Sequence, residues 1–331
     1  MTAPPERADA RQVKLRTLIG AAQTGTPDED RGIESAYPSG TLDDGSRLWI
    51  LADDQQPERA LGSALLEAAG RKRRDLVVFY DDPDSAAKAA RRVQALDPKP
   101  EVRLIDGRAS RLVDPAPLPK RSVMPEPPDR FEDICYSSGV DPICEHGIWR
   151  GEVLGLEVAR AVDGEVMVGV GRADQETALL LHPGRPTAEA LVEAADHVRA
   201  HRHSGAGAHP LATLARERWL RHDLLKESTR VAITDLTPVD PADERFGLRS
   251  RSPAPAIGLD GGGRRVLVVC TVGVDTAAVP ATADLVLREV PDRVLVAMPP
   301  SDILGAVERA VSQLAIPAAV VGVRGSWERP G

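Results

Sequence analysis

Residues 145–182 set charged side chains into a stretch that is unusually apolar and rich in glycine. The turn signal Asp163-Gly164 lies near the middle of this stretch and is typical of a two-residue β-hairpin. We therefore predict that the stretch forms one hairpin in which Val162 pairs with Glu165. Glycines inside strands mark a bulge or the close approach of another segment, so a site is to be sought here first.

Counting outward from the turn places Glu157, Arg172 and Asp174 on one face of the predicted hairpin. In this register Gly155 lies opposite Arg172, and Val153 lies opposite Asp174. Charges among such small and apolar residues are either paired or functional. A structural ion pair between Glu157 and Arg172 is the plainer interpretation, and a functional carboxylate at position 157 is the other.

A hairpin followed by a helix, with acidic residues on the strands, resembles the core of PD-(D/E)XK nucleases. The resemblance covers at most residues 130–205. It implies a Mg²⁺ site that activates water, with Glu157, Asp174 and Glu176 as the catalytic carboxylates and nucleic acid as the substrate. The family's Glu-x-Lys pattern is not matched, because Ala159 stands where the lysine belongs.

The helix predicted after the hairpin carries a second group of candidates. His197 and His201 are one helical turn apart, a spacing that can share a Zn²⁺ ion. A solvated basic helix end is the plainer interpretation. Further along, Arg218 and Arg221 extend a basic patch that either meets phosphates or only solvates a helix face. The residues assigned to ligand binding are Arg172, His197, His201 and Arg218, and no metal is assigned.

Alternating apolar runs and helical stripes over residues 47–106 predict a βαβαβ unit with a parallel sheet and right-handed crossovers. The last part of the chain repeats this outline. The predicted fold class is α/β, with two Rossmann-like units that flank a module of a β-hairpin and a helix. The predicted segments are a flexible N-terminal arm (1–45), an α/β unit (46–110), a Pro-rich linker (111–130), a hairpin-centred α+β module (131–235), a second linker (236–264) and a C-terminal α/β unit (265–331).

Aspartates follow the predicted strands of the first unit, at Asp53, Asp54, Asp81, Asp82 and Asp106. The carboxyl ends of parallel strands are where open α/β sheets bind ligands, and carboxylates there could hold Mg²⁺. Aspartate is also a preferred N-cap for the helices that follow such strands, which is the plainer interpretation.

Composition limits the classes of function. A net charge of -8 argues against bulk nucleic-acid binding, although a local basic patch is compatible with it. Three cysteines without paired spacing indicate a reducing cytoplasm. The N-terminus has no apolar run of the signal-peptide kind, and the longest apolar run is too short to span a membrane. We therefore predict a cytoplasmic protein that does not associate with membranes.

Three stretches, EHGIWRGEVLGLEVARAV, VGVGRADQE and LARERWLR, resemble a set of proteins from high-GC Gram-positive bacteria. This resemblance implies a bacterial cytoplasmic protein and brings no activity with it. The chain shows no nucleophile elbow, phosphate-binding loop or Glu-x-Lys pattern. We therefore predict a non-catalytic protein that binds a ligand or a partner and has a regulatory role. The alternative is a metal-dependent nuclease or phosphodiesterase, and only this alternative requires Mg²⁺ and nucleic acid.

Overall fold

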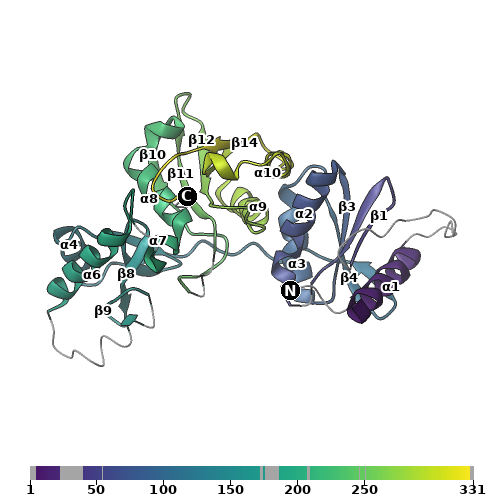
Figure 1. Cartoon of the computed structure of the whole chain (residues 1–331), viewed down its shortest axis with the longest axis horizontal. Helices are drawn as coiled ribbons and strands as arrows, with labels where there is room; N and C mark the ends of the chain where they lie inside the picture. The colour runs from purple at the N-terminus through teal and green to yellow at the C-terminus, as the bar shows by residue number, and fades with distance from the viewer. Residues whose placement is uncertain are drawn as a thin grey trace. The chain divides into compact units, whose positions relative to one another are not determined.

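A computed structural model describes residues 5–22 (side chains from residue 10), 40–53, 55–171, 174–175, 186–206, 209–245, 247–249 and 251–328. Helices and three sheets form a mixed α/β fold, which confirms the predicted class (Figure 1). The elements gather into two compact units. Unit 1 comprises residues 1–119, 276–288 and 304–317, and unit 2 comprises residues 120–275, 289–303 and 318–331.

The sheet of unit 1 has five strands in sequential order, β1 (Thr41–Asp43), β2 (Arg47–Leu51), β3 (Asp75–Tyr80), β4 (Glu101–Asp106) and β5 (Ala109–Leu112). Strands β2, β3 and β4 are parallel, and α2 (Ala60–Arg71) and α3 (Pro83–Arg92) connect them. The predicted βαβαβ unit is therefore confirmed. Asp82 caps α3, because its carboxylate accepts a hydrogen bond of 2.7 Å from the Ser85 N–H.

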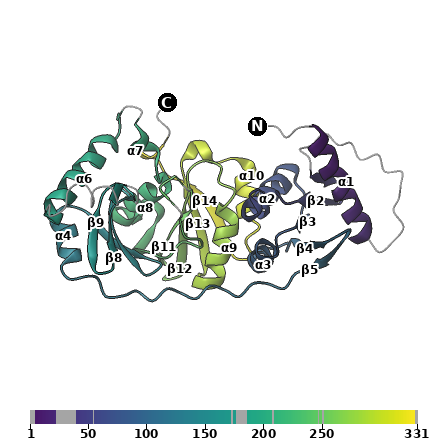
Figure 2. The same ribbon diagram turned by 90° about the horizontal axis from the view of Figure 1, so that it is seen from below.

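Helix α1 (Pro5–Ala22) packs on the sheet of unit 1 (Figure 2). Its Leu15 and Leu18 are buried in one cluster with Trp49 and Phe79. This packing corrects the prediction of a flexible arm for residues 5–22. The fully buried residues of α1 in this cluster are two leucines one turn apart, and Ile19 and Ala22 pack against them. So short an apolar stripe in a mostly polar segment explains the prediction of a loose arm.

Two helices from later in the chain complete unit 1, α9 (Ala278–Glu289), whose residues to 288 belong to this unit, and α10 (Gly305–Val311). Asp284 of α9 is buried and accepts hydrogen bonds of 2.8 and 2.9 Å from the Nε and Nη2 atoms of Arg91. Arg309 of α10 donates a 2.7 Å hydrogen bond to the Ala69 carbonyl. The segment predicted as one C-terminal unit thus contributes helices to unit 1.

Unit 2 contains a second five-stranded sheet, with β10 (Ile233–Pro238), β11 (Ala254–Asp260), β12 (Arg265–Cys270), β13 (Arg293–Met298) and β14 (Ala318–Gly322) in sequential order. Strands β10, β11 and β12 are antiparallel, and β12, β13 and β14 are parallel. Strand β11 lies inside residues 236–264, so the prediction of a linker over this range is wrong for β11. Its Pro255 and Gly258 suggested a loop, but its buried Ala254 and Ala256 pair with β12.

The other sheet of unit 2 is an antiparallel meander of β6 (Asp141–Glu145), β7 (Ile148–Val153), β8 (Leu156–Val162) and β9 (Glu165–Val168). The predicted turn is confirmed, because Val162 pairs with Glu165 around Asp163 and Gly164. The prediction of one single hairpin is wrong, because β7 and β8 are separate strands of the meander. Leu154 and Gly155 form a second turn with positive φ of 49° and 74°, so Gly155 belongs to a turn between β7 and β8 and not to a strand.

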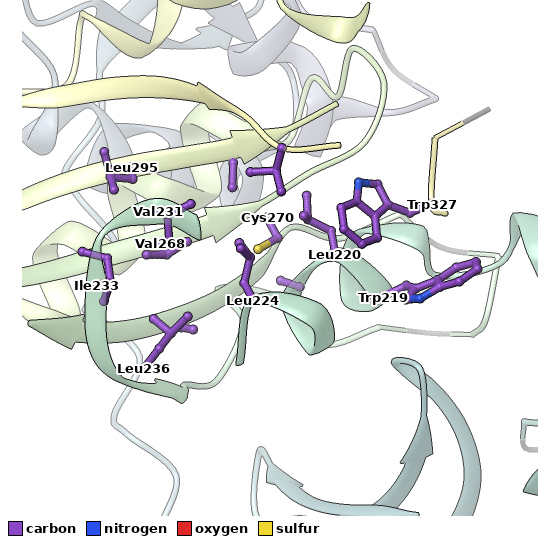
Figure 3. Packing of buried hydrophobic residues seen from close by; sticks show 14 of the residues in the cluster. Trp219, Leu220, Leu224, Val231, Ile233, Leu236, Val268, Cys270, Leu295 and Trp327 are labelled. Carbon is purple, nitrogen blue, oxygen red and sulfur yellow. The ribbon is translucent and has the colours of Figure 1, made fainter. Parts of the chain in front are cut away.

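Within the described residues, unit 2 includes the α-helices α4 (Phe131–Ser137), α6 (Thr187–His201), α7 (Pro210–Thr213) and α8 (Arg216–Lys226). The predicted stripe of Leu191, Ala195 and Val198 on α6 is buried in one cluster with apolar residues of the meander. Leu220 and Leu224 of α8 instead pack among residues of the five-stranded sheet, including Val268 and Cys270 (Figure 3). Within the described part of the chain, no helix is long and apolar enough to cross a membrane.

Candidate functional site

Helix α8 is buried although most of its residues are polar. Leu220 and Leu224 form its apolar stripe, and Arg218 and Arg221 are three residues apart on another stripe. These arginines are only 2% and 1% exposed. The prediction of a solvated basic face is therefore wrong at both positions. The physical reason is that a sheet packs against each stripe of α8. The leucines contact the five-stranded sheet, and the arginines face carboxylates of the meander and not water.

The turn at Leu154 and Gly155 touches the backbone of α8 directly. A Cβ atom on Gly155 would lie 2.3 Å from the Arg218 carbonyl carbon and 2.5 Å from the Trp219 nitrogen. The φ of Gly155 is also positive, at +74°. Glycine is required here for both reasons. The contact holds the backbone of Arg218 close to the turn of the meander.

Two glutamates of the meander neutralise the arginines of α8. Arg218 donates through Nη1 to Glu145 at 2.7 Å and through Nη2 to Glu152, and Arg221 donates through Nη1 to Glu145 at 2.7 Å. Burial alone would raise the pKa of Glu145, but the charges and hydrogen bonds of the two arginines hold it well below its usual range. Burial alone would lower the pKa of Arg218, but the charges and hydrogen bonds of the two glutamates raise it above its ordinary value. Glu145 and Arg218 therefore stay ionised at neutral pH.

Arg221 has donor groups that this cluster does not use. Its Nε and Nη2 atoms are buried and make no hydrogen bond within the described residues. The nearest carboxylate oxygen to Nη2, on Glu152, lies 3.6 Å away, beyond hydrogen-bond distance. A buried donor without a partner costs free energy, so this edge of the guanidinium calls for water or a ligand.

Arg221 lines a hollow of about 210 Å³ in unit 2. Glu152 and Arg218 also line it. Its apolar walls are Pro142, Ile143, Leu225 and Pro238. The hollow thus combines apolar walls with a few ionised groups, which is typical of a small-molecule site.

An aspartate with two basic partners lies on the rim of this hollow. Asp141 accepts from His222 Nδ1 at 3.0 Å and from Lys226 Nζ at 2.8 Å. Burial raises the pKa of Asp141, but hydrogen bonds from His222 and Lys226 bring it below its ordinary value. Tyr136, which is 65% exposed, lines the same hollow. These four side chains also line an adjoining hollow of about 310 Å³.

Glu157 lies in a closed ion-pair network on the same sheet. Its carboxylate accepts from Arg160 Nε and Nη2 at 2.8 and 3.0 Å and lies 3.1 Å from Arg150 Nε. Gln175 donates a further hydrogen bond of 3.2 Å. A bulge between Gly151 and Glu152 shifts the register of β8, which brings position 157 to the face of Arg150 and Arg160.

The remaining hairpin candidates are not brought to Glu157 by any described contact. Arg172 and Glu176 lie outside the described residues. Asp174 accepts a hydrogen bond of 2.7 Å from the Val170 N–H. Within the described residues, the partners found for Glu157 come from β7, from β8 and from Gln175. The predicted pair with Arg172 stays a prediction.

The histidines of α6 stack with a third imidazole. His201 lies 3.6 Å from His209 between ring centroids at an interplanar angle of 10°, and His197 lies 5.1 Å from His201. Loss of hydration and the neighbouring imidazoles lower the pKa of His201. Within the described residues, no group of three or more His, Cys, Asp or Glu side chains is arranged to hold a metal ion.

Two of the strand-end aspartates of unit 1 are engaged with side-chain or capping partners. Asp81 accepts from Lys14 Nζ at 2.7 Å, and Asp82 caps α3. The capping interpretation is therefore confirmed at Asp82.

The sequence did not point to Glu145, Glu152, Asp141 or Lys226. The signal that was available lies in α8, where Arg218, Arg221, His222 and Leu225 follow the helical spacing of one buried stripe. Their carboxylate partners lie more than sixty residues earlier in the chain, so only the fold shows them. The chain matches no protein-family model, no curated protein and no solved structure.

Proposed function

We propose that this chain is a non-catalytic ligand-binding protein and that unit 2 binds a small polar molecule in the hollow lined by Arg221. The observation that carries the proposal is the buried guanidinium of Arg221, which is 1% exposed, lines the hollow and has two donor atoms without hydrogen bonds in the described structure. Evolved proteins rarely leave such donors unfilled. A bound ligand would satisfy these two donor atoms. Tyr136 lines the hollow and is exposed, so a ligand can reach the hollow from solvent at this residue.

We place this activity in the cytoplasm, since all three cysteines are free thiols, as is usual in a reducing compartment. The three parallel strands of each five-stranded sheet support a description of these parts as Rossmann-like. That description is an analogy of fold and adds no function. Regulation by the bound ligand is part of the proposal.

No described contact favours the alternative of a Mg²⁺-dependent nuclease. Both carboxylate oxygens of Glu157 are engaged by arginines. A metal ion there would have to displace Arg150 and Arg160 from a buried carboxylate, which is costly.

The proposal is tested by filling the hollow. In Ile143→Trp the indole occupies the space between the apolar walls, and Val162→Trp on β8 is the matched control, because Val162 is 38% exposed and does not line the hollow. The probes are acetate, inorganic phosphate, acetamide and methylammonium. Binding is followed by the backbone N–H resonances of Tyr136 and Lys226.

We expect at least one probe to shift these resonances in the original protein and in Val162→Trp, and none to shift them in Ile143→Trp. The proposal fails if no probe acts on the original protein. It also fails if Ile143→Trp binds as well as the control does.

A further inference from the structure

We infer that the ligand of this hollow is an anion with two oxygens, a carboxylate or a phosphate, held by the Nε and Nη2 edge of Arg221. The inference rests on the proposed function and names the chemical class of its ligand. The Nε–H and the adjacent Nη2–H of an arginine are parallel donors whose spacing matches the two oxygens of a carboxylate or a phosphate. Among the described residues neither atom of Arg221 finds a hydrogen-bond partner, since Glu152 lies 3.6 Å from Nη2, while Nη1 is held by Glu145.

The same edge is filled elsewhere in this chain. Arg160 binds both oxygens of Glu157 through Nε and Nη2 at 2.8 and 3.0 Å. Arg91 binds both oxygens of Asp284 through the same two atoms at 2.8 and 2.9 Å. A carboxylate is therefore the partner that this fold itself supplies to such an edge, and Arg221 is the more deeply buried arginine that lines a hollow instead.

The unused donors of Arg221, and not the net charge around the hollow, favour an anion. Both oxygens of Glu145 are already used, one by Arg218 and one by Arg221. Glu152 accepts from Arg218, which leaves the free edge of Arg221 without a hydrogen-bonded carboxylate. A cation placed against this edge would meet a guanidinium at short range. An anion would fill the two unused donors of the guanidinium. Lys226 adds no net charge, because Asp141 of the same lining accepts from it at 2.8 Å.

The size of the hollow restricts the ligand further. At about 210 Å³ it is smaller than the roughly 300–1,000 Å³ typical of sites for drug-sized ligands. Its apolar walls of Ile143 and Leu225 leave room for a short hydrocarbon part beside the anionic group. A small carboxylic acid and a small phosphate ester share this chemistry, and the probes distinguish them.

The experiment compares probes in the original protein and in Arg221→Lys. Lysine keeps a positive charge beside Glu145 but removes the paired donors, so the ion-pair cluster remains balanced. Acetate and succinate represent carboxylates, inorganic phosphate represents phosphates, and acetamide and methylammonium represent uncharged and cationic ligands. The Nε–H resonance of Arg221, assigned by its loss in the variant, reports binding at the edge itself, and the backbone resonances of the hollow give the dissociation constants.

We expect an anionic probe to shift the Arg221 Nε–H resonance and to bind about 10- to 100-fold more weakly to Arg221→Lys. Ile143→Trp should abolish this binding. If acetamide or methylammonium binds in the hollow as tightly as the anions and Arg221→Lys does not change their affinity, the inference is overturned while the proposed function stands. If no probe shifts any resonance of the hollow, both are overturned.

Discussion

Two arginines of unit 2 show opposite outcomes for the same chemical group. Arg160 lies on β8 and gives its Nε and Nη2 atoms to Glu157, three residues away in the chain. Arg221 lies on α8, and its corresponding atoms have no hydrogen bond in the described structure. The first arginine is 23% exposed in its side chain and the second only 1%. The deeper arginine is thus the less satisfied one, which is the reverse of what stability alone favours.

This contrast shows that the density of charges does not identify a site. The region of Glu157 also holds buried charges, but the carboxylate there is fully engaged by Arg150 and Arg160. A site needs a group whose partners are incomplete, placed where a ligand can reach it. In this molecule the hollow beside α8 meets that condition, and the network at Glu157 does not.

The largest effect is expected when the carboxylate shared by both buried arginines is neutralised. Glu145→Gln leaves Arg218 and Arg221 without their common counter-charge, so the free energy of unfolding should fall by about 3–5 kcal/mol. Glu157→Gln is the matched comparison. It should cost only about 1–2 kcal/mol, because Arg150 and Arg160 are partly exposed and can turn to water. Urea unfolding measures both, and equal losses would contradict the contrast.

A second prediction concerns the contact that holds α8 over the meander. Gly155→Ala adds a Cβ atom against the backbone of Arg218 and forces alanine to a positive φ, so it should cost about 2–4 kcal/mol. Gly164→Ala in the neighbouring turn is the control. That residue has φ of +81° but no atom within 4 Å, so only the backbone strain of about 1 kcal/mol applies. Thermal unfolding compares the two variants, and a milder effect at position 155 would show that α8 is not fixed by this turn.

Acid should weaken unit 2 through its paired carboxylates. The pKa of Glu157 would be raised by burial but is lowered below its ordinary value by Arg160 and Arg150. A depressed pKa in the folded state means that the stabilisation is complete above the unfolded pKa of about 4.3 and is lost as the pH falls. Glu157→Gln should therefore flatten the decline of unfolding free energy below about pH 5. Urea titrations at several pH values test this, and a curve parallel to that of the original protein would refute it.

The smallest effect is expected at the stacked histidines. His209→Ala removes a ring stacked on His201 and the acceptor for the Leu211 N–H at the start of α7, which should cost about 0.5–1 kcal/mol. The variant should bind phosphate as the original protein does, because none of these residues lines the hollow. A change in phosphate affinity would connect the two regions and weaken the distinction drawn between them.

Local sequence patterns predicted much of the fold but little of the site. The βαβαβ unit over residues 47–106 and the turn at Asp163-Gly164 follow from periodicity and turn chemistry, which are local. The second turn was missed because Leu154 is not a usual residue at positive φ, and its conformation is stabilised by the contact of Gly155 with α8. The bulge that turned Glu157 toward Arg160 likewise depends on tertiary packing.

Arg221 illustrates the same limit. Its helical stripe was visible in the sequence, but whether an arginine on that stripe meets water, a carboxylate or a hollow depends on strands that are far away in the chain. Burial and pairing are properties of the assembled unit, and they decide which of several arginines is available to a ligand.

The most direct measurement is the dissociation constant of inorganic phosphate, or of succinate where that binds more tightly, for Arg221→Lys and Arg160→Lys side by side. Both variants keep their charge and lose the paired Nε and Nη2 donors. We predict that Arg221→Lys weakens binding at least about tenfold and that Arg160→Lys leaves it unchanged. Equal affinities in the two variants would contradict the claim that the open edge of Arg221 is the ligand site of this protein.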